Sequence, residues 1–303
     1  CALPISALWM ISARVGKALM KLSPPSISSM TYRRDSMKKY LSFFRLRFIT
    51  GLQYRTAALA GIATQFFWGA MEILTFRAFY QSDPASFPMT LQATSSYIWI
   101  QQAFLVLFMG WNMEAELFDA IRDGNISYEL CRPLGIYHMW FARSLAYRLS
   151  RAGLRCLPIL LAAAFIPAPY GLAAPPDLQA FLLFLLTLFL GLFNVAAFCM
   201  LIYMLSFFTI TPDGIRIVAL SVTELLQGAI IPLPFFPDAV RQILELLPFA
   251  AMQNVPLRVY SGDLSGAALE QAILLQFFWL AVMVFAGKIL EQRAMKRIVV
   301  QGG

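Results

Sequence analysis

Apolar segments about as long as a bilayer is thick alternate with short polar segments along most of the chain. A helix needs roughly 20 apolar residues to cross the hydrocarbon core of a membrane. The candidate segments, in order, are 57–80, 94–113, 151–170, 178–210, 217–232 and 267–287. The fourth exceeds what a bilayer needs, so we expect it to tilt, bend or protrude. The pattern predicts an all-α polytopic membrane protein with six transmembrane helices.

A basic segment with an apolar stripe precedes the first span. Apolar side chains in residues 37–55 recur at helical spacing, and Lys and Arg side chains surround them. This pattern is typical of an interfacial helix that lies on the cytoplasmic leaflet. The alternative is a basic flank that only orients the first span.

Residues 1–36 differ from the rest of the chain. They begin on Cys1 rather than Met, and Met30 and Met37 are natural starting points. Arg14 and Lys17 interrupt the apolar part, which does not fit a signal peptide. We expect this extension to be disordered or an upstream artefact, with a short genuine extension as the alternative. Residues 37–303 then form a single transmembrane domain.

The longest polar stretch, residues 114–155, lies between the second and third spans. Its first part predicts a short helix with one apolar edge, closed by Gly124 in a left-handed cap. The apolar edge consists of Leu117, Phe118 and Ile121, and the acidic residues are Glu114, Glu116, Asp119 and Asp123. Such a helix in the region 114–133 suits docking to a soluble partner. The alternative on helical spacing alone is a solvated loop.

Prolines interrupt the apolar stretch between the fifth and sixth spans. They are Pro232, Pro234, Pro237 and Pro248. The segment 238–246 between them is short and amphipathic. We expect a re-entrant or interfacial helical hairpin on the outer side, in which Pro232, Pro237 and Pro248 shape an outer gate. The alternative is a plain extracellular loop.

Composition and charge add an orientation to this picture. Only 13% of the residues are charged, against about 25% in soluble domains, and 59% are hydrophobic. The net charge of +8 comes from basic residues that cluster beside apolar segments, which indicates a membrane leaflet rather than nucleic acid. The loops 81–92 and 167–177 contain no Lys or Arg. By the positive-inside rule, both termini and the 114–155 stretch lie in the cytoplasm.

The sequence contains none of the common catalytic motifs. The phosphate-binding loop GxxxxGK[ST], the nucleophile motif GxSxG and the zinc motif HExxH are all missing. The four cysteines are scattered and His138 is the only histidine, so we expect neither a disulfide framework nor a metal site. We therefore predict that the chain is not an enzyme by itself and binds no cofactor of its own.

Two carboxylates fall inside predicted spans, where each costs about 2.5–3.5 kcal/mol on insertion scales. Glu224 lies near the middle of the fifth span, close to Gln227. Glu72 shares a face of the first span with Gln65 and lies nearer the outer interface. Either these side chains line a pathway or a subunit contact, or they hydrogen bond and hold helices together.

Three arginines recur on one face at the inner end of the third span. They are Arg148, Arg151 and Arg155. Snorkelling of their long side chains to lipid headgroups explains them. The alternative is an inner vestibule that attracts an anionic substrate.

Two strings resemble motifs of the permease subunit of ABC-2-type exporters, in a bacterial branch related to the DUF990 group. They are IRDGNISYELCRPL, from residue 121, and GAIIPLPFFPDAVRQILELLPF, from residue 228, the latter followed by PLRVYSG. The second string is the more specific one. The resemblance covers about residues 37–299.

The resemblance implies a type V exporter fold in the bacterial cytoplasmic (inner) membrane. It also implies two permeases, a related second permease being favoured over a homodimer, and separate ABC ATPase subunits that carry ATP and Mg. The region 114–124 would then match the coupling helix that receives force from the ATPase. Membrane lipids are expected as further partners, and nucleic acid is not.

Two other classes of protein stay open on the residues alone. An ion-coupled secondary transporter would use Glu224 and Glu72, although no inverted repeat relates the two halves of the chain. A non-transporting membrane scaffold would need no ATPase. Drugs, lipids, peptides and glycans are all open as substrates.

Overall fold

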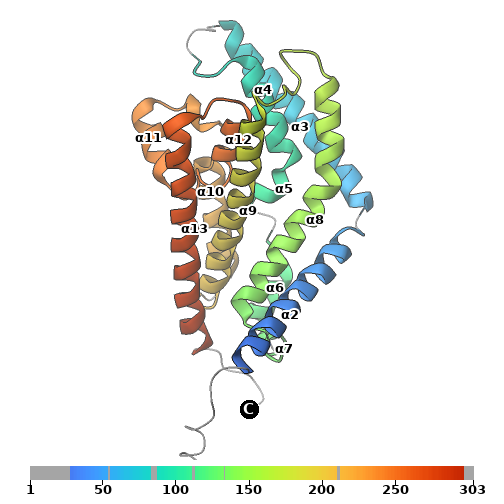
Figure 1. The fold of residues 1–303 in the computed structure, drawn as a ribbon, viewed down its shortest axis with the longest axis vertical. Coiled ribbons are helices and arrows are strands. Elements are labelled where there is room, and N and C mark those ends of the chain that lie inside the picture. The colour runs from blue at the N-terminus through green and yellow to red at the C-terminus, as the bar shows by residue number, and fades with distance from the viewer. Residues whose placement is uncertain are drawn as a thin grey trace, which may run out of the picture. The chain divides into compact units, whose positions relative to one another are not determined.

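The computed structural model describes residues 28–53, 55–82, 87–110, 113–132, 134–209 and 212–296, and the regular elements in these ranges are helices (Figure 1). The chain divides into two compact units, Cys1–Ser42 and Phe43–Gly303. Of the N-terminal extension, residues 1–27 lie outside the described part, as does Pro133 at the end of the predicted coupling region. Helix α2 (Ser28–Gly51) begins before residue 37 and so includes residues 28–36 of the predicted extension.

Among the described residues, three helices have the length and apolarity of membrane spans. They are α3 (Arg55–Ser82), α9 (Leu178–Ser206) and α13 (Gly266–Met295), at the positions of the first, fourth and sixth predicted spans. Asp177 fixes the start of α9, because its carboxylate accepts a hydrogen bond from the backbone N of Ala180 at 2.6 Å.

The second predicted span consists of two helices. The first, α4 (Leu91–Ala103), begins at Thr90, whose hydroxyl accepts a hydrogen bond from the backbone N of Ala93. The chain turns at Phe104 and continues as the short helix α5 (Leu105–Phe108). This break was not expected, because the sequence of the segment is apolar throughout the turn.

The end of the polar stretch and the third span form one helix. The stretch begins with α6 (Ala115–Arg122) and α7 (Ile126–Leu130), as two short helices. Helix α8 (Ile136–Phe165) then runs without interruption through the predicted kink site Pro158. The predicted third span, 151–170, therefore overlaps the second half of a longer helix whose first half is charged.

The fifth predicted span, 217–232, is misplaced. Helix α10 (Pro212–Leu226) starts earlier, and its 15 residues rise only about 22 Å, less than the roughly 30 Å of a bilayer core. Gly228 follows with a φ of 81°, a left-handed conformation that favours glycine and ends the helix. Irregular backbone at membrane depth is stable only where protein covers it or where it lines a cavity. The stability of the irregular backbone at residues 227–232 therefore depends on which residues cover it.

The proline-rich segment folds into three short helices. They are η2 (Leu233–Phe235), α11 (Asp238–Leu246) and α12 (Asn254–Tyr260). The bounds of α11 agree with the predicted amphipathic segment. Helix α12 is largely buried against α9 and α4, so it is not an exposed arm of the predicted helical hairpin.

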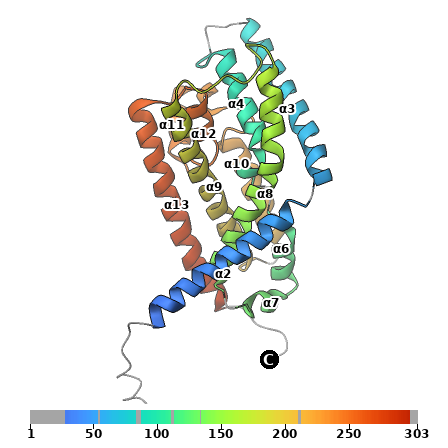
Figure 2. The same ribbon diagram turned by 45° about the vertical axis from the view of Figure 1, so that its right-hand side comes forward.

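Within the unit Phe43–Gly303, α9 occupies a central position and contacts α8, α10, α12 and α13 (Figures 1 and 2). At one end of the helices, Tyr260 Oη donates a hydrogen bond to Ala173 O at 3.0 Å. At the other end, the backbone N of Tyr137 donates to Glu291 Oε1 at 2.9 Å. The loop predicted to lie outside and the segments predicted to be cytoplasmic thus gather at opposite ends.

Candidate functional site

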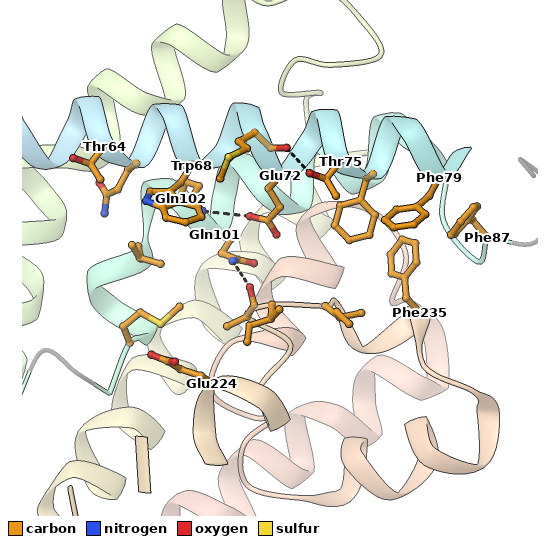
Figure 3. A pocket seen from close by; sticks show the side chains of 18 residues that line it. Thr64, Trp68, Glu72, Thr75, Phe79, Phe87, Gln101, Gln102, Glu224 and Phe235 are labelled. Carbon is orange, nitrogen blue, oxygen red and sulfur yellow. Dashed lines mark hydrogen bonds between the residues drawn. The ribbon is translucent and has the colours of Figure 1, made fainter. Parts of the chain in front are cut away.

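A groove with a volume of about 830 Å³ lies between α3, the α4–α5 pair and the backbone that follows α10. A cavity of this size suits a small molecule. Figure 3 shows Phe79, Phe87 and Phe235 together at one end, and Glu224 away from them. Glu72 lines the same groove, so the two carboxylates predicted on separate spans share one site.

The groove contains polar atoms whose hydrogen bonds are incomplete. Gln102 Nε2 donates to Glu72 Oε2 at 3.4 Å, while Glu72 Oε1 is buried without a partner among the described residues. Gln65, only 4% exposed, lines the groove with neither amide atom bonded within the described part of the chain. Buried polar atoms of this kind are rare in stable proteins and mark places where a ligand or water binds.

The irregular backbone after α10 is covered by α4. Tyr97 Oη donates to Gly228 O at 3.2 Å. Gln101 Nε2 donates to Ala229 O at 2.8 Å (Figure 3). These bonds satisfy carbonyls that a continuing helix would have satisfied internally. Gln227 is fully buried beside Met109, whose Sδ accepts its Nε2 at 3.6 Å, so it lies behind the groove and not in its lining.

The predicted coupling helix exists as α6, but its apolar edge does not face outward. Leu117 and Phe118 are only 2% and 3% exposed, and the Phe118 ring packs 4.8 Å from the Tyr203 ring of α9. Ile121 is half-buried. Gly124 follows the helix with a φ of 72°, as its predicted capping role requires. The apolar edge therefore anchors α6 to the neighbouring helices. Because these helices bury it, the edge is not available to dock a partner.

Arg143 on α8 holds α6 from a second side. Its guanidinium pairs with Glu114 at 2.6 Å and with Glu116, and the Arg143 side chain is almost completely buried. Burial alone would lower the pKa of Arg143, but the two carboxylates outweigh this effect and raise its pKa above the ordinary value. The backbone N of Glu114 also donates to Tyr203 Oη at 2.8 Å. Glu114 is therefore part of an ion pair and is not free for a partner.

Helix α6 is also in contact with the helix that ends at the groove. The Arg216 guanidinium of α10 lies over the Phe118 ring, with its carbon 5.6 Å from the ring centroid. Arg216 and Glu224 belong to the same helix and are separated by about 12 Å along its axis. Helix α10 thus extends from its contact with α6 to the groove.

Arg148 neither snorkels to lipid headgroups nor lines an inner vestibule, the two roles that the sequence had suggested. Its side chain is completely buried and donates to the carbonyls of Val106, Leu107 and Met109 at 3.0, 3.2 and 2.8 Å. The carbonyls at the end of a helix lack partners within it, and a cation there also complements the helix dipole. Arg148 therefore closes the end of α5 and contacts neither lipid nor substrate.

The other arginines of that predicted face diverge. Arg151 lies over the Tyr147 ring at 4.0 Å. Arg155 covers Gly61 of α3, where a Cβ atom would meet its guanidinium, and contacts Ala57 O at 3.5 Å. Both are half-buried, so neither lies free at a vestibule.

The predicted gate prolines lie next to the ends of the short helices in the proline-rich segment. Pro232 precedes η2 and Pro237 precedes α11, while Pro248 follows the end of α11. Pro232 is buried next to the groove residue Ile231, whereas Pro237 is exposed. Their role in gating stays a prediction.

Sequence reasoning did not identify Gln101, Gln102 or Arg143 as site residues. Two adjacent amides in the middle of an apolar span are an available signal for the first two. Arg143 gave no such signal, because its partners are 27 and 29 residues away in the chain.

Comparison with known proteins identifies the family. The model of the ABC-2 family transporter protein matches residues 66–302, which is most of the chain. No curated protein and no solved structure matches it. The match spans α4 to α13 and most of α3, and it includes α6 and the groove except for Thr64 and Gln65. It confirms the resemblance to ABC-2 permeases. The chain belongs to the ABC-2 family of transporter proteins, as a multi-pass membrane component for transport.

Proposed function

We propose that the chain is the permease subunit of an ATP-driven exporter and is coupled to a separate ATPase through α6 and α7. The observation that carries this proposal is the contact between α6 and α10 through Phe118 and Arg216, because α10 ends at the groove. A push on α6 from the ATPase would move the wall of the groove. The ATP and Mg would be bound by the partner.

We place α3, the α4–α5 pair, α8, α9, α10 with the segment after it, and α13 across a bacterial inner membrane. Both termini and α6 would face the cytoplasm, in agreement with the basic residues of these segments. The shortness of α10 is compatible with this arrangement, since Tyr97 and Gln101 satisfy the backbone that follows it. The proline-rich helices would lie at the outer side.

The corner formed by α6 and α7 supplies the ATPase docking surface in this proposal. Tyr128 is 75% exposed, and Leu130, Arg122 and Asp123 are exposed beside it. An exposed tyrosine with charged neighbours is typical of an interface anchor. This surface replaces the buried edge of Leu117 and Phe118 as the site of contact.

The groove would form the substrate path together with a second permease. Trp68 and Ile230 on its rim are 57% and 61% exposed, although both are large and apolar. A second permease that covers them would close the path from lipid. The resemblance favours a related but different chain for this role, and the remaining apolar surface would face lipids.

Purification of the native complex tests the proposal. We expect an ATPase with a phosphate-binding loop to co-purify with the chain from its own membrane. A native complex without such an ATPase would contradict the proposal and favour a secondary transporter or a scaffold.

The Tyr128→Ala variant tests the docking surface. We expect its affinity for the ATPase to fall about tenfold, because an interface tyrosine commonly contributes more than 1 kcal/mol. Binding of the purified ATPase to the detergent-solubilised permease measures this. Phe165→Ala is the matched control, since Phe165 is an aromatic residue even more exposed than Tyr128 but lies at the far end of α8. Unchanged affinity in Tyr128→Ala would reject this surface.

A further inference from the structure

We infer that the groove binds a lipophilic organic cation. The transport of such a cation rests on the proposed function, whereas its binding to the groove does not. The inference is drawn from the charge of the lining, its unsatisfied acceptors and its aromatic walls.

The charge of the groove is opposite in sign to that of the chain. The whole sequence carries a net charge of +8, with 24 Lys and Arg against 16 Asp and Glu. The described residues that line the groove nevertheless include Glu72 and Glu224 and no Lys, Arg or His. No hydrogen bond or ion pair joins Glu224 to another described residue. The closest basic side chain along α3, Arg77, lies over the Tyr170 ring instead.

Unsatisfied oxygen atoms point to a ligand with positive charge. Glu72 Oε1 and Gln101 Oε1 are buried without partners among the described residues, while Gln65 has both its amide oxygen and its amide nitrogen unpaired there and so favours neither sign of charge. All three residues line the groove, and Gln65 and Gln101 are more than nine-tenths buried. Such oxygens cost free energy unless a ligand satisfies them. The end of α10 beside them adds the partial negative charge of a helix C-terminus.

The walls select a bulky apolar cation over a small ion. The Phe235 ring lies 5.1 Å from the Phe76 ring and 5.7 Å from the Phe87 ring, so these side chains form a continuous aromatic surface. Aromatic faces attract cations and also bury apolar groups. Figure 3 places the aromatic end apart from Glu224, which suits an amphiphile with its charge at one end.

Tetraphenylphosphonium and tetraphenylborate provide a matched pair of probes, because they share size and shape but carry opposite charges. We expect the full-length, detergent-solubilised permease to bind tetraphenylphosphonium in equilibrium dialysis and to bind tetraphenylborate at least tenfold more weakly. Glu72→Gln and Glu224→Gln should each weaken binding of the cation about tenfold, since each keeps the shape of the side chain and removes its charge. Glu270→Gln is the control, because Glu270 is exposed on α13 outside the groove.

Equal binding of the two probes would overturn the inference. Full binding of the cation by a variant that combines Glu72→Gln and Glu224→Gln would overturn it as well. A groove that is covered by a second permease and takes up no cation would overturn it too. Two further outcomes distinguish a failure of the cation site from a failure of the proposed function. If the ATPase co-purifies but tetraphenylphosphonium does not bind, the substrate class is wrong and the permease function stands. If the cation binds but no ATPase is found, the coupling is wrong and the binding site stands.

Discussion

Arg148 shows how a single buried charge can hold a broken membrane helix in place. The short helix α5 ends within the protein, and its last carbonyls have no partners of their own. Arg148 satisfies them from α8 and also contacts Cys199 Sγ of α9 at 3.1 Å. Three helices therefore meet at one guanidinium, which explains why an arginine is stable at this buried position.

Replacement of Arg148 should destabilise the protein. In Arg148→Met three carbonyls lose a charged donor, and we expect a loss of about 3 kcal/mol in the free energy of unfolding. Thermal unfolding in detergent measures this loss. Arg151→Ala serves as the control one turn further along the same helix, because Arg151 only stacks on Tyr147. Equal stability of Arg148→Met and the wild type would contradict the structural role.

Helix α6 is fixed from two directions, which makes it suited to transmit force. Phe118 anchors it to α9 and α10, and Arg143 anchors it to α8 through Glu114 and Glu116. A helix that was free to tilt on its own would absorb a push without moving its neighbours.

Loss of the Arg143 ion pairs should loosen this element. We expect Arg143→Ala to lower the free energy of unfolding by about 2 kcal/mol, because it leaves the partly buried Glu114 carboxylate unpaired. ATP hydrolysis should persist while transport per ATP falls, since Tyr128 is untouched. Unfolding in detergent and transport in proteoliposomes measure the two effects. Arg122→Ala is the control for the unfolding measurement alone, because Arg122 pairs with Asp119 on the solvent side and its loss should not measurably change the free energy of unfolding. Intact transport in Arg143→Ala would argue against the role of this ion pair.

The sequence predicted elements best where one local signal dominates. The predicted starts of the fourth span at residue 178 and of the segment 238–246 agree with the starts of α9 and α11, where the structure shows a capping Asp177 and a preceding Pro237. The end of α10 was not predicted, because the apolar pattern of residues 217–232 continues past Gly228 while the helix ends before it. Hydropathy reports burial in lipid or protein alike, so it cannot locate a break that other helices compensate.

The site was predictable only in part for a related reason. Glu72 and Glu224 stood out as charges in apolar segments, but their joint position in the groove depends on the packing of α3 against α4 and on the end of α10. The apolar edge of Leu117 and Phe118 was visible, yet helical spacing does not reveal whether such an edge faces a partner or the same chain. Arg148 was assigned to lipid because its carbonyl partners lie about 40 residues away.

At the scale of the whole molecule, the proposed ATPase docking and substrate binding would both depend on one connected set of helices. The exposed corner at Tyr128 continues into α6, α6 contacts α10, and α10 ends at Glu224 and the groove. The account therefore predicts that nucleotide bound by the ATPase changes the groove, and that the change requires an intact corner.

The labelling rate of a cysteine at Ile230 tests this claim most directly. Ile230 is exposed on the groove rim, and Ile230→Cys would be introduced into a chain whose four natural cysteines are replaced by serine. The account predicts that ATP with vanadate changes the rate of maleimide labelling severalfold in the complex with the ATPase, and that Tyr128→Ala removes this response. An identical labelling rate with and without nucleotide in the intact complex would contradict it.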